Sequence, residues 1–336
     1  MPRKYLVTIL LLTATVLLVC SPVLAKSFTY KRLGNAQDAQ TTPRFGIAMM
    51  GGGSDLDEAF RWLGDKANGG DFLVLRAHGS DDYNSYVKGL STLNSVATLV
   101  IPDKNTAQDP QVAEIIHHAE AIFIAGGDQS LYVNFWQGTP VQDALNAHIA
   151  ARKPIGGTSA GLAVLGEYVF ACLADKPDDP NLSSVQVLSN PFFYRVTIVR
   201  DYLKIPLLEN LITDSHFAKR DRLGRSLGFL ARIVQDGWAK NPREIAIDEK
   251  SALLVEADGK SKVIGTGKGV YFLRVTEAPK VCQKDQPLTL HNISAYLGPT
   301  GSTFDLPSWT GAGGQSYTLD VDAGIVHSSR PDKSLY

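Results

Sequence analysis

One serine in the sequence stands in a setting that suits a nucleophile. The stretch Gly157-Thr158-Ser159-Ala160-Gly161 fits the pattern G-x-S-x-G, after a short apolar run and before a helix-like one. On a tight strand-to-helix turn the glycines remove side chains that would collide, and the serine hydroxyl is left exposed. The amide of Ala160, at the start of the helix, can then point at a developing oxyanion. The alternative is a glycine turn without chemistry, because the pattern alone is weak in a chain with 30 glycines.

A serine nucleophile needs a base, usually histidine, and that base needs an acid to orient it. Of the seven histidines, His216 differs from the others because it lies in the charged segment TDSHFAKRDRLGR, just before a predicted helix. His78 follows a predicted strand and is a second candidate for the same sheet edge. The alternative explanation of the charges around His216 is a solvated basic helix start.

The candidate acids lie later in the chain. Asp248 and Glu249 close a strand-like run, EIAIDE, and Asp128 and Asp214 are competitors. A late carboxylate gives the chain order serine, histidine, acid. The order in α/β-hydrolases is serine, acid, histidine. A triad in this chain would therefore not be the triad of that fold.

Short apolar runs alternate with helix-like stretches through the first half of the chain. Strands that are apolar throughout and alternate with helices indicate an α/β fold, with a mostly parallel central sheet and helices on both faces. From Arg243 onward short strands dominate, which predicts a strand-rich C-terminal part. The apolar runs are residues 45–53, 72–80, 94–102, 120–130 and 153–161.

Ligands in such a sheet bind at the carboxyl ends of the strands. Glycine-rich turns follow predicted strands at residues 51–53, 126–127 and 156–157, so we expect all of them along one edge. Helical spacing is predicted for 162–174 and for 221–238, and an extended pattern for 185–200. The turn that carries Ser159 is thereby placed at the ligand-binding edge.

The N-terminal residues have the composition of a secretory signal. A basic start is followed by an apolar run to Cys20 and by small residues up to Ala25, where cleavage is expected. The alternative is an uncleaved membrane anchor, but the run is near the short end for a bilayer span. We therefore expect a secreted or periplasmic protein without a stable membrane anchor. The predicted organisation is signal peptide 1–25, N-terminal arm 26–43, catalytic α/β domain 44–275 and a strand-rich extension 276–336 packed on that domain.

Composition limits the classes of function. The chain has 336 residues, 44% of them hydrophobic, and a formal net charge of −1, which allows a large core and argues against a nucleic-acid binder. No phosphate-binding G-x-x-x-x-G-K-[ST] motif occurs. Cys20 would leave with the signal. Cys172 and Cys282 would either form a disulfide in an oxidising compartment or stay as two buried thiols.

Four separated motifs together resemble one known family. GTSAG, FIAGGDQ, DSHFAKRDRLGR and AIDEKSALLVE, in this order, resemble the cyanophycinase group of the S51 serine peptidases. The resemblance runs from about Phe45 to Leu273. That group includes aspartyl dipeptidases, and its fold is similar to the class I glutamine amidotransferases. The resemblance therefore implies this fold for the chain.

The resemblance also implies roles for individual residues. Ser159 resembles the family's nucleophile, His216 its general base and Glu249 its acid, with Asp248 as the alternative acid. The amides of Gly127 and Ala160 resemble the oxyanion hole. No metal and no organic cofactor is implied. Positions that match the family's pocket around a bound aspartyl unit are Gln129, Asp214, Arg220, Arg222 and Arg225.

The implied activity is that of a secreted serine exopeptidase. Its substrate would be cyanophycin (multi-L-arginyl-poly-L-aspartate) or a related β-aspartyl peptide, and its product the dipeptide β-Asp-Arg. One departure from the family is Ser215, where many cyanophycinases carry glutamine, and it leaves the substrate open. The alternatives are an aspartyl or isoaspartyl dipeptidase without polymer activity, and a non-catalytic binding protein of the same fold. A homodimer is expected only from the resemblance.

Overall fold

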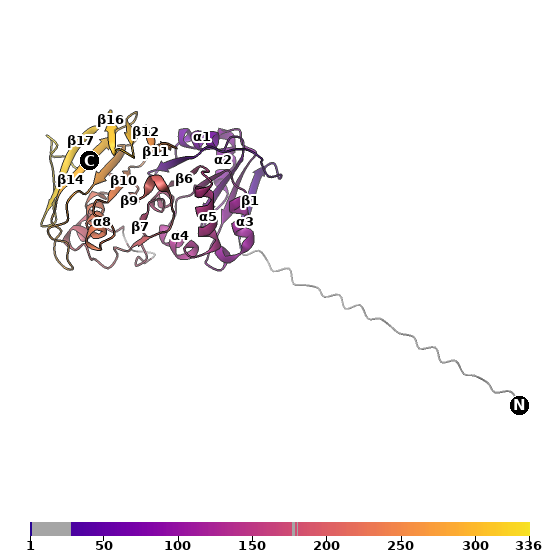
Figure 1. The fold of residues 1–336 in the computed structure, drawn as a ribbon, viewed down its shortest axis with the longest axis horizontal. Helices are drawn as coiled ribbons and strands as arrows, with labels where there is room; N and C mark the ends of the chain where they lie inside the picture. The colour runs from indigo at the N-terminus through magenta and orange to yellow at the C-terminus, as the bar shows by residue number, and fades with distance from the viewer. Residues whose placement is uncertain (2–27, 177–178, 180) are drawn as a thin grey trace.

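The computed structural model describes Met1 and residues 28–336, apart from 177, 178 and 180 (Figure 1). The predicted signal peptide, residues 1–25, thus lies outside the described residues except for Met1. Within the described part of the chain, no helix is long and apolar enough to cross a membrane.

The strands form two sheets. Sheet A has ten strands in the order β1-β4-β3-β5-β6-β2-β11-β12-β15-β16, and sheet B has eight in the order β18-β17-β14-β13-β10-β9-β7-β8. The predicted apolar runs form the parallel centre of sheet A, which consists of β4 (Ser95–Val100), β3 (Asp71–Arg76), β5 (Ala121–Ile124), β6 (Ile155–Thr158) and β2 (Gly46–Met50). The α/β class is therefore confirmed, and so is the strand-rich C-terminal part.

Helices cover both faces of this parallel centre because its strands are apolar on both faces. Ile47 and Met49 belong to one apolar cluster, and the alternate residues Ala48 and Met50 belong to another. The second cluster packs under α1 (Asp57–Lys66) and α2 (Asp82–Leu90). The first packs against the helices drawn on the opposite side of the sheet in Figure 1, which are α3 (Pro110–His117), α4 (Gln129–Trp136) and α5 (Pro140–Ala150).

Sheet B packs against the same apolar cluster as sheet A. Ile245 and Ile247 of β10 (Arg243–Ile247) join Leu253 of sheet A, whereas Ala246 faces a separate cluster under α8 (Leu223–Gln235). In sheet B, β9 (Leu211–Asp214) runs parallel to β10 and to β7, and the other pairings are antiparallel. Strands β6, β9 and β10 end where the two sheets meet, and that position determines where the site lies.

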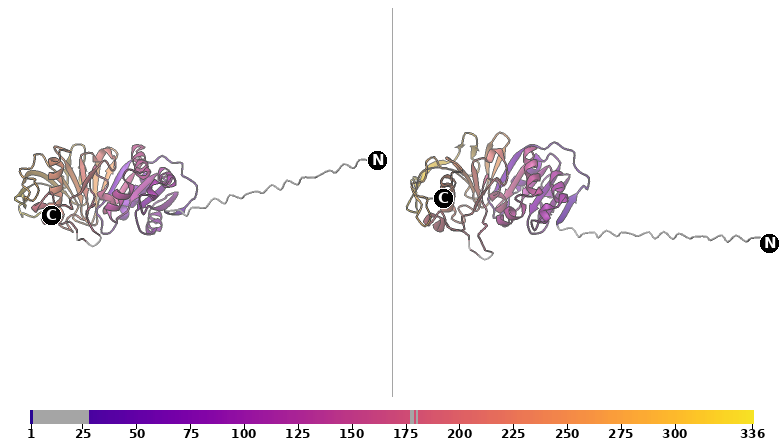
Figure 2. Two further views of the ribbon diagram at one scale, coloured as in Figure 1. Left: turned by 90° about the horizontal axis from the view of Figure 1, so that it is seen from below. Right: turned by 60° about the horizontal axis from the view of Figure 1, so that its bottom comes forward.

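The residues before 44 and after 275 also extend the sheets. Within the predicted N-terminal arm, 26–43, β1 (Thr29–Gly34) pairs with β4 at the edge of sheet A. After residue 275 the chain adds strands to sheet B and to sheet A, and in both views of Figure 2 this late, yellow part lies at the far end of the molecule from the indigo part. These strands are β14 (Leu290–Gly298), β15 (Thr303–Asp305), β16 (Thr310–Ala312), β17 (Gln315–Asp322) and β18 (Ile325–Ser328). The domain boundary at 275/276 stays a prediction.

Two local predictions are wrong. The helix expected over 162–174 ends early, because α6 covers only Ala160–Ala163 and the chain then forms β7 (Tyr168–Phe170). A continuous apolar run has no period that distinguishes a helix from a strand. Here residues 168–170 form a strand because they pair with β9 and β8. The extended pattern of 185–200 contains a helix, α7 (Ser184–Ser189), before β8 (Ile198–Arg200). The remaining elements are the 3₁₀ turns Thr106–Gln108 and Pro206–Leu208 and the strands β11 (Ser251–Glu256), β12 (Lys260–Gly265) and β13 (Val270–Arg274).

Candidate active site

Ser159 lies on a sharp turn between β6 and α6. Its backbone has φ 52° and ψ −115°, a conformation that L-residues rarely adopt, and its N–H donates to the carbonyl of Met50 at 3.1 Å. The flanking glycines are needed for close packing, because a Cβ on Gly157 would lie 2.5 Å from the carbonyl carbon of Gly161. Gly156 and Gly157 stand inside β6 rather than after it, so the turn itself begins at Ser159. The chain here has the geometry of a nucleophile turn.

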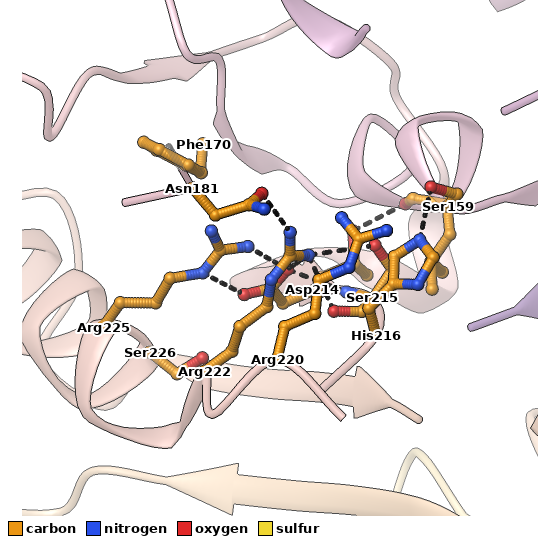
Figure 3. A network of polar contacts seen from close by, with 12 residues as sticks. Ser159, Phe170, Asn181, Asp214, Ser215, His216, Arg220, Arg222, Arg225 and Ser226 are labelled. Carbon is orange, nitrogen blue, oxygen red and sulfur yellow. Dashed lines mark hydrogen bonds and ion pairs between the residues drawn. The ribbon is translucent and has the colours of Figure 1, made fainter. Parts of the chain in front are cut away.

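The three residues predicted for a triad are in direct contact. The Ser159 hydroxyl lies 2.7 Å from Nε2 of His216, and Nδ1 of His216 lies 2.7 Å from Oε1 of Glu249 (Figure 3 shows the serine and the histidine). Ser159 comes from sheet A, whereas His216 and Glu249 follow β9 and β10 of sheet B. The contact therefore depends on how the two sheets pack.

The competing candidates have other partners. Asp248 is buried and its Oδ1 accepts from the backbone N–H of Lys219 at 2.9 Å. Asp128 caps α4 by accepting from the N–H of Ser130. The ring of His78 packs edge-on against Phe135. Glu249 is thus the carboxylate that the structure brings to His216.

The glycine turn after β2 shapes the site from the opposite side. The carbonyl of Gly51 accepts from the N–H of His216 at 2.8 Å, and His216 itself has a left-handed φ of 47°. A Cβ on Gly52 would lie 2.5 Å from Nε2 of His216, and one on Gly53 would lie 3.0 Å from the Glu249 side chain. The sequence predicted this turn at the sheet edge but not its contact with the histidine and the acid.

Replacing Gly52 by alanine is expected to lower kcat by about 100-fold, because the added methyl group displaces the His216 ring from Ser159. Gly52 has φ +91°, and Gly69 has φ +78° with nothing within 4 Å of an added Cβ. Gly69→Ala therefore carries similar backbone strain without the collision. Steady-state kinetics and thermal melts of both variants separate the two effects. Equal activity loss in both would contradict a specific contact between position 52 and His216.

Burial and hydrogen bonding set the protonation of the pair. Burial lowers the pKa of His216 below its usual value, although the hydrogen bond with Glu249 opposes this shift. The same hydrogen bond lowers the pKa of the Glu249 carboxyl. At neutral pH the site therefore holds a neutral imidazole beside a carboxylate, as a general base requires.

This electrostatic setting predicts a pH profile. A general base works only in its neutral form, so activity falls as pH drops through the pKa of His216. Since that pKa is lowered, we expect the acid limb of kcat/KM below pH 6.5. Glu249 raises the pKa of His216, so Glu249→Gln should move the acid limb to still lower pH while reducing the plateau. An acid limb at or above pH 7 in the unmodified protein would contradict this assignment.

Backbone amides line the cleft beside Ser159. Gly127, which has φ +155°, and Ala160 both line it, and no hydrogen bond involves their N–H groups among the described residues. Two free N–H donors next to a serine hydroxyl are what a tetrahedral oxyanion needs. The geometry agrees with the predicted oxyanion positions, and their role stays a prediction.

The cleft has a volume of about 590 Å³ and a cationic wall. Arg220, Arg222 and Arg225 line it together with Ser215 and Gln129. Arg222 is buried, yet its Nε has no hydrogen-bond partner within the described part of the chain. Burial, and after it the neighbouring Arg225, lower the pKa of Arg222 to about 9. Asp128, Asp175, Lys176 and Asp179 also line the cleft, so the part suited to an anionic group is the arginine wall and not the cleft as a whole.

Asp214 is the exception among the predicted pocket residues. It is 3% exposed and does not line the cleft. Arg225 binds its two oxygens at 2.6 and 2.8 Å, and Arg222 donates to one of them at 3.1 Å (Figure 3). Although burial alone would raise the pKa of Asp214, the two arginines hold it below its usual value. The predicted substrate contact is therefore corrected: Asp214 holds the arginines that line the cleft.

A second buried carboxyl lies near this cluster. Glu244 of β10 is fully buried, accepts from Ser226 at 2.6 Å and, among the described residues, has no ion pair. Burial, and after it Asp214, raise the pKa of Glu244 to about 8. Near neutral pH it is thus mostly protonated and does not cancel the charge of the arginines. The sequence offered no signal for it, since Glu244 opens an ordinary strand pattern.

The remaining predicted pocket residues lie around the cleft as follows. Gln129 donates to the Cys172 sulfur at 3.2 Å and to the carbonyl of Phe170 at 3.4 Å. The backbone carbonyl of Ser215 accepts a hydrogen bond from Arg222 at 2.8 Å.

Cys172, which lines the cleft, and the buried Cys282 are both free thiols, so the structure favours the unpaired alternative. Among the described residues, no group of His, Cys, Asp and Glu is arranged to hold a metal ion.

Comparisons with known proteins agree with the motifs. The model for peptidase family S51 matches residues 74–195, a range that contains Ser159 but ends before His216 and Glu249. A cyanophycinase of Trichormus variabilis is 27% identical over 216 residues, which is 63% of this chain and 65% of that protein. A cyanophycinase of Synechococcus elongatus is 26% identical over 218 residues, 64% of this chain and 61% of that protein. The match thus spans slightly less than two thirds of these relatives.

Solved structures of peptidases were also matched. A peptidase from an acI-B1 Actinobacterium has a TM-score of 0.46 and 16% identity, and the match covers 85% of this chain and 97% of that one. A peptidase E-like protein from Listeria monocytogenes has a TM-score of 0.42 and 13% identity, covering 67% of this chain and all of that one.

Proposed function

We propose that this chain, which belongs to the cyanophycinase-like S51 peptidases, is a secreted serine exopeptidase that releases β-Asp-Arg dipeptides from cyanophycin or related β-aspartyl peptides. The family assignment rests on the S51 match and on the cyanophycinase relatives. The observation that supports the activity most is the chain of contacts from Ser159 through His216 to Glu249, beside a cleft walled by arginines.

The proposed mechanism is acyl transfer in two steps. His216 takes the proton of Ser159 as the hydroxyl attacks the carbonyl, and the N–H groups of Gly127 and Ala160 bind the oxyanion. The C–N bond breaks and the leaving amine takes the proton from His216. Water, deprotonated by His216, then attacks the acyl-enzyme and regenerates Ser159. Glu249 stays ionised and orients the ring throughout.

The cleft supports an aspartyl unit on the acyl side. Release of β-Asp-Arg from the polymer breaks a backbone amide between two aspartyl units, and each unit carries the free carboxylate of its arginine. The half-exposed guanidinium of Arg220, which lines the cleft together with Arg222 and Arg225, is a donor group suited to a carboxylate. Ser215 leaves more room here than the longer side chain common in the family. We therefore include short β-aspartyl peptides among the substrates.

Substrate assays test the proposal. Purified protein is incubated with cyanophycin, with β-aspartyl dipeptides and with an α-linked Asp-Arg peptide, and the products are followed by mass spectrometry. We expect release of β-Asp-Arg from the polymer and no cleavage of the α-linked control. Cleavage of dipeptides alone would overturn the polymer activity in favour of a dipeptidase. Binding of β-Asp-Arg without any turnover would support the non-catalytic alternative.

Secretion is part of the proposal and has its own support and test. The basic start, apolar run and small residues before Ala25 support export. Expression of the full chain with N-terminal sequencing of the exported product should give a mature protein that begins near residue 26. A full-length chain retained in the membrane would overturn this part alone.

A further inference from the structure

Helix α8, which carries Arg225 and starts next to Arg222, begins without a side-chain cap of its own. Arg222 is the N-cap residue of α8, and its side chain makes no capping hydrogen bond. A guanidinium group has only donors, so it cannot accept from the first-turn N–H groups that lack partners inside the helix. Residues with a side-chain acceptor are preferred at this position. Here the guanidinium binds Asp214 instead, and the start of the helix needs acceptors from elsewhere.

Two distant residues supply these acceptors. The hydroxyl of Tyr336 accepts from the N–H of Leu223 at 2.8 Å, and the hydroxyl of Ser184 accepts from the N–H of Arg225 at 3.3 Å. The Tyr336 hydroxyl also donates to Oδ1 of Asp221 at 2.8 Å. One hydroxyl thus binds the residues on both sides of Arg222.

The position of the Tyr336 hydroxyl is itself fixed by packing. Its ring lies edge-on to Phe217, at 5.7 Å and 79°, and to Tyr271, at 6.1 Å and 82°. Phe217 directly follows His216 in the sequence. Asp221 has a left-handed φ of 49°, which costs energy in a non-glycine residue and persists only where surrounding contacts hold it. The Tyr336 hydroxyl supplies such a contact.

We propose that Tyr336 is a positioning residue for substrate binding. Through Leu223 and Asp221 it fixes the first turn of α8, and with it the guanidinium groups that line the cleft. His216 and Glu249 are held separately, by Gly51 and by the mutual hydrogen bond. Loss of the hydroxyl should therefore affect KM more than kcat. The inference rests on the proposed function in so far as the arginines bind the substrate's carboxylate.

The kinetic test uses Tyr336→Phe, which keeps the packed ring and removes only the hydroxyl. We expect KM for a β-aspartyl substrate to rise about tenfold, the size expected when an N–H loses its acceptor in a partly buried site. We expect kcat to change less than about threefold. The matched control is Tyr317→Phe, because the Tyr317 hydroxyl is buried in sheet B without a hydrogen-bond partner among the described residues. That control should leave both constants unchanged.

Two further measurements do not depend on turnover. Hydrogen exchange at the Leu223 amide should be at least tenfold faster in Tyr336→Phe than in Tyr317→Phe. The rate at which a small fluorophosphonate labels Ser159 should be the same in both, since that probe does not use the arginines. Unchanged exchange at Leu223, or a fall in kcat with KM unchanged, would overturn the positioning role. If the unmodified protein cleaves none of the peptides, the proposed function fails, and the exchange result decides this inference by itself.

Discussion

Replacing Ser159 by alanine is expected to lower kcat for β-Asp-Arg release by about 10⁴-fold or more, with KM and thermal stability nearly unchanged. The change removes one oxygen atom, which contacts Nε2 of His216 at 2.7 Å. Alanine fits the same turn, so the backbone of the turn does not need to move. The residual activity of the variant should come from oxyanion binding and substrate positioning, which accelerate hydrolysis only slightly.

A double variant makes this prediction specific. If Ser159 and His216 act as one unit, Ser159→Ala/His216→Ala should be no slower than either single variant. Independent contributions would instead multiply the two losses. Multiplied losses, or a Ser159→Ala variant that keeps more than about a tenth of the activity, would mean that another group attacks the carbonyl.

Replacing Asp214 by asparagine is expected to have the largest effect on stability. The change leaves Arg222 and Arg225 buried with no anion between them, and removal of one partner from a buried ion pair costs about 3–5 kcal/mol. The freed guanidinium groups would also leave their places in the cleft, so KM should rise at least tenfold in whatever fraction stays folded. Urea unfolding and kinetics below the melting temperature measure the two effects.

The matched control for Asp214 lies at the C-terminal end of α8, the helix that carries Arg225. Asp236 pairs with Arg232 at 3.0 Å, but both side chains are partly exposed, at 21% and 17%. Asp236→Asn should cost less than about 1 kcal/mol, because solvent screens an exposed pair, and should leave KM unchanged. Similar losses from both substitutions would contradict the view that burial of the Asp214 cluster determines its importance.

Much of the parallel centre could be predicted from the sequence because its signals are local. Apolar runs with alternating helices predict β2 to β6, and G-x-S-x-G marks the turn at Ser159. The antiparallel part could not be predicted, because its pairings join residues far apart in sequence. Strand β11, for example, pairs with β2. The run that becomes β7 was assigned as helix because burial on all sides removes its periodicity.

The candidate site shows the same division between local and long-range signals. The pattern and the chain order indicated Ser159, His216 and a carboxylate at 248 or 249. Which of these two adjacent carboxylates faces His216 depends on the backbone of the turn after β10, and the sequence does not define that backbone. In the sequence, Asp214 matched a pocket position. Only the structure shows that this residue is buried and hydrogen-bonded to Arg225. The contact of Tyr336 with Leu223 spans 113 residues and left no local signal.

Covalent labelling by a serine-reactive fluorophosphonate, located by peptide mapping, tests directly whether Ser159 is an activated nucleophile. We expect one label per chain, on the peptide that contains Ser159. Preincubation with β-Asp-Arg should slow the labelling, and His216→Ala should nearly abolish it. Label on a different residue, or no label on a protein that actively releases β-Asp-Arg, would show that Ser159 is not the activated nucleophile.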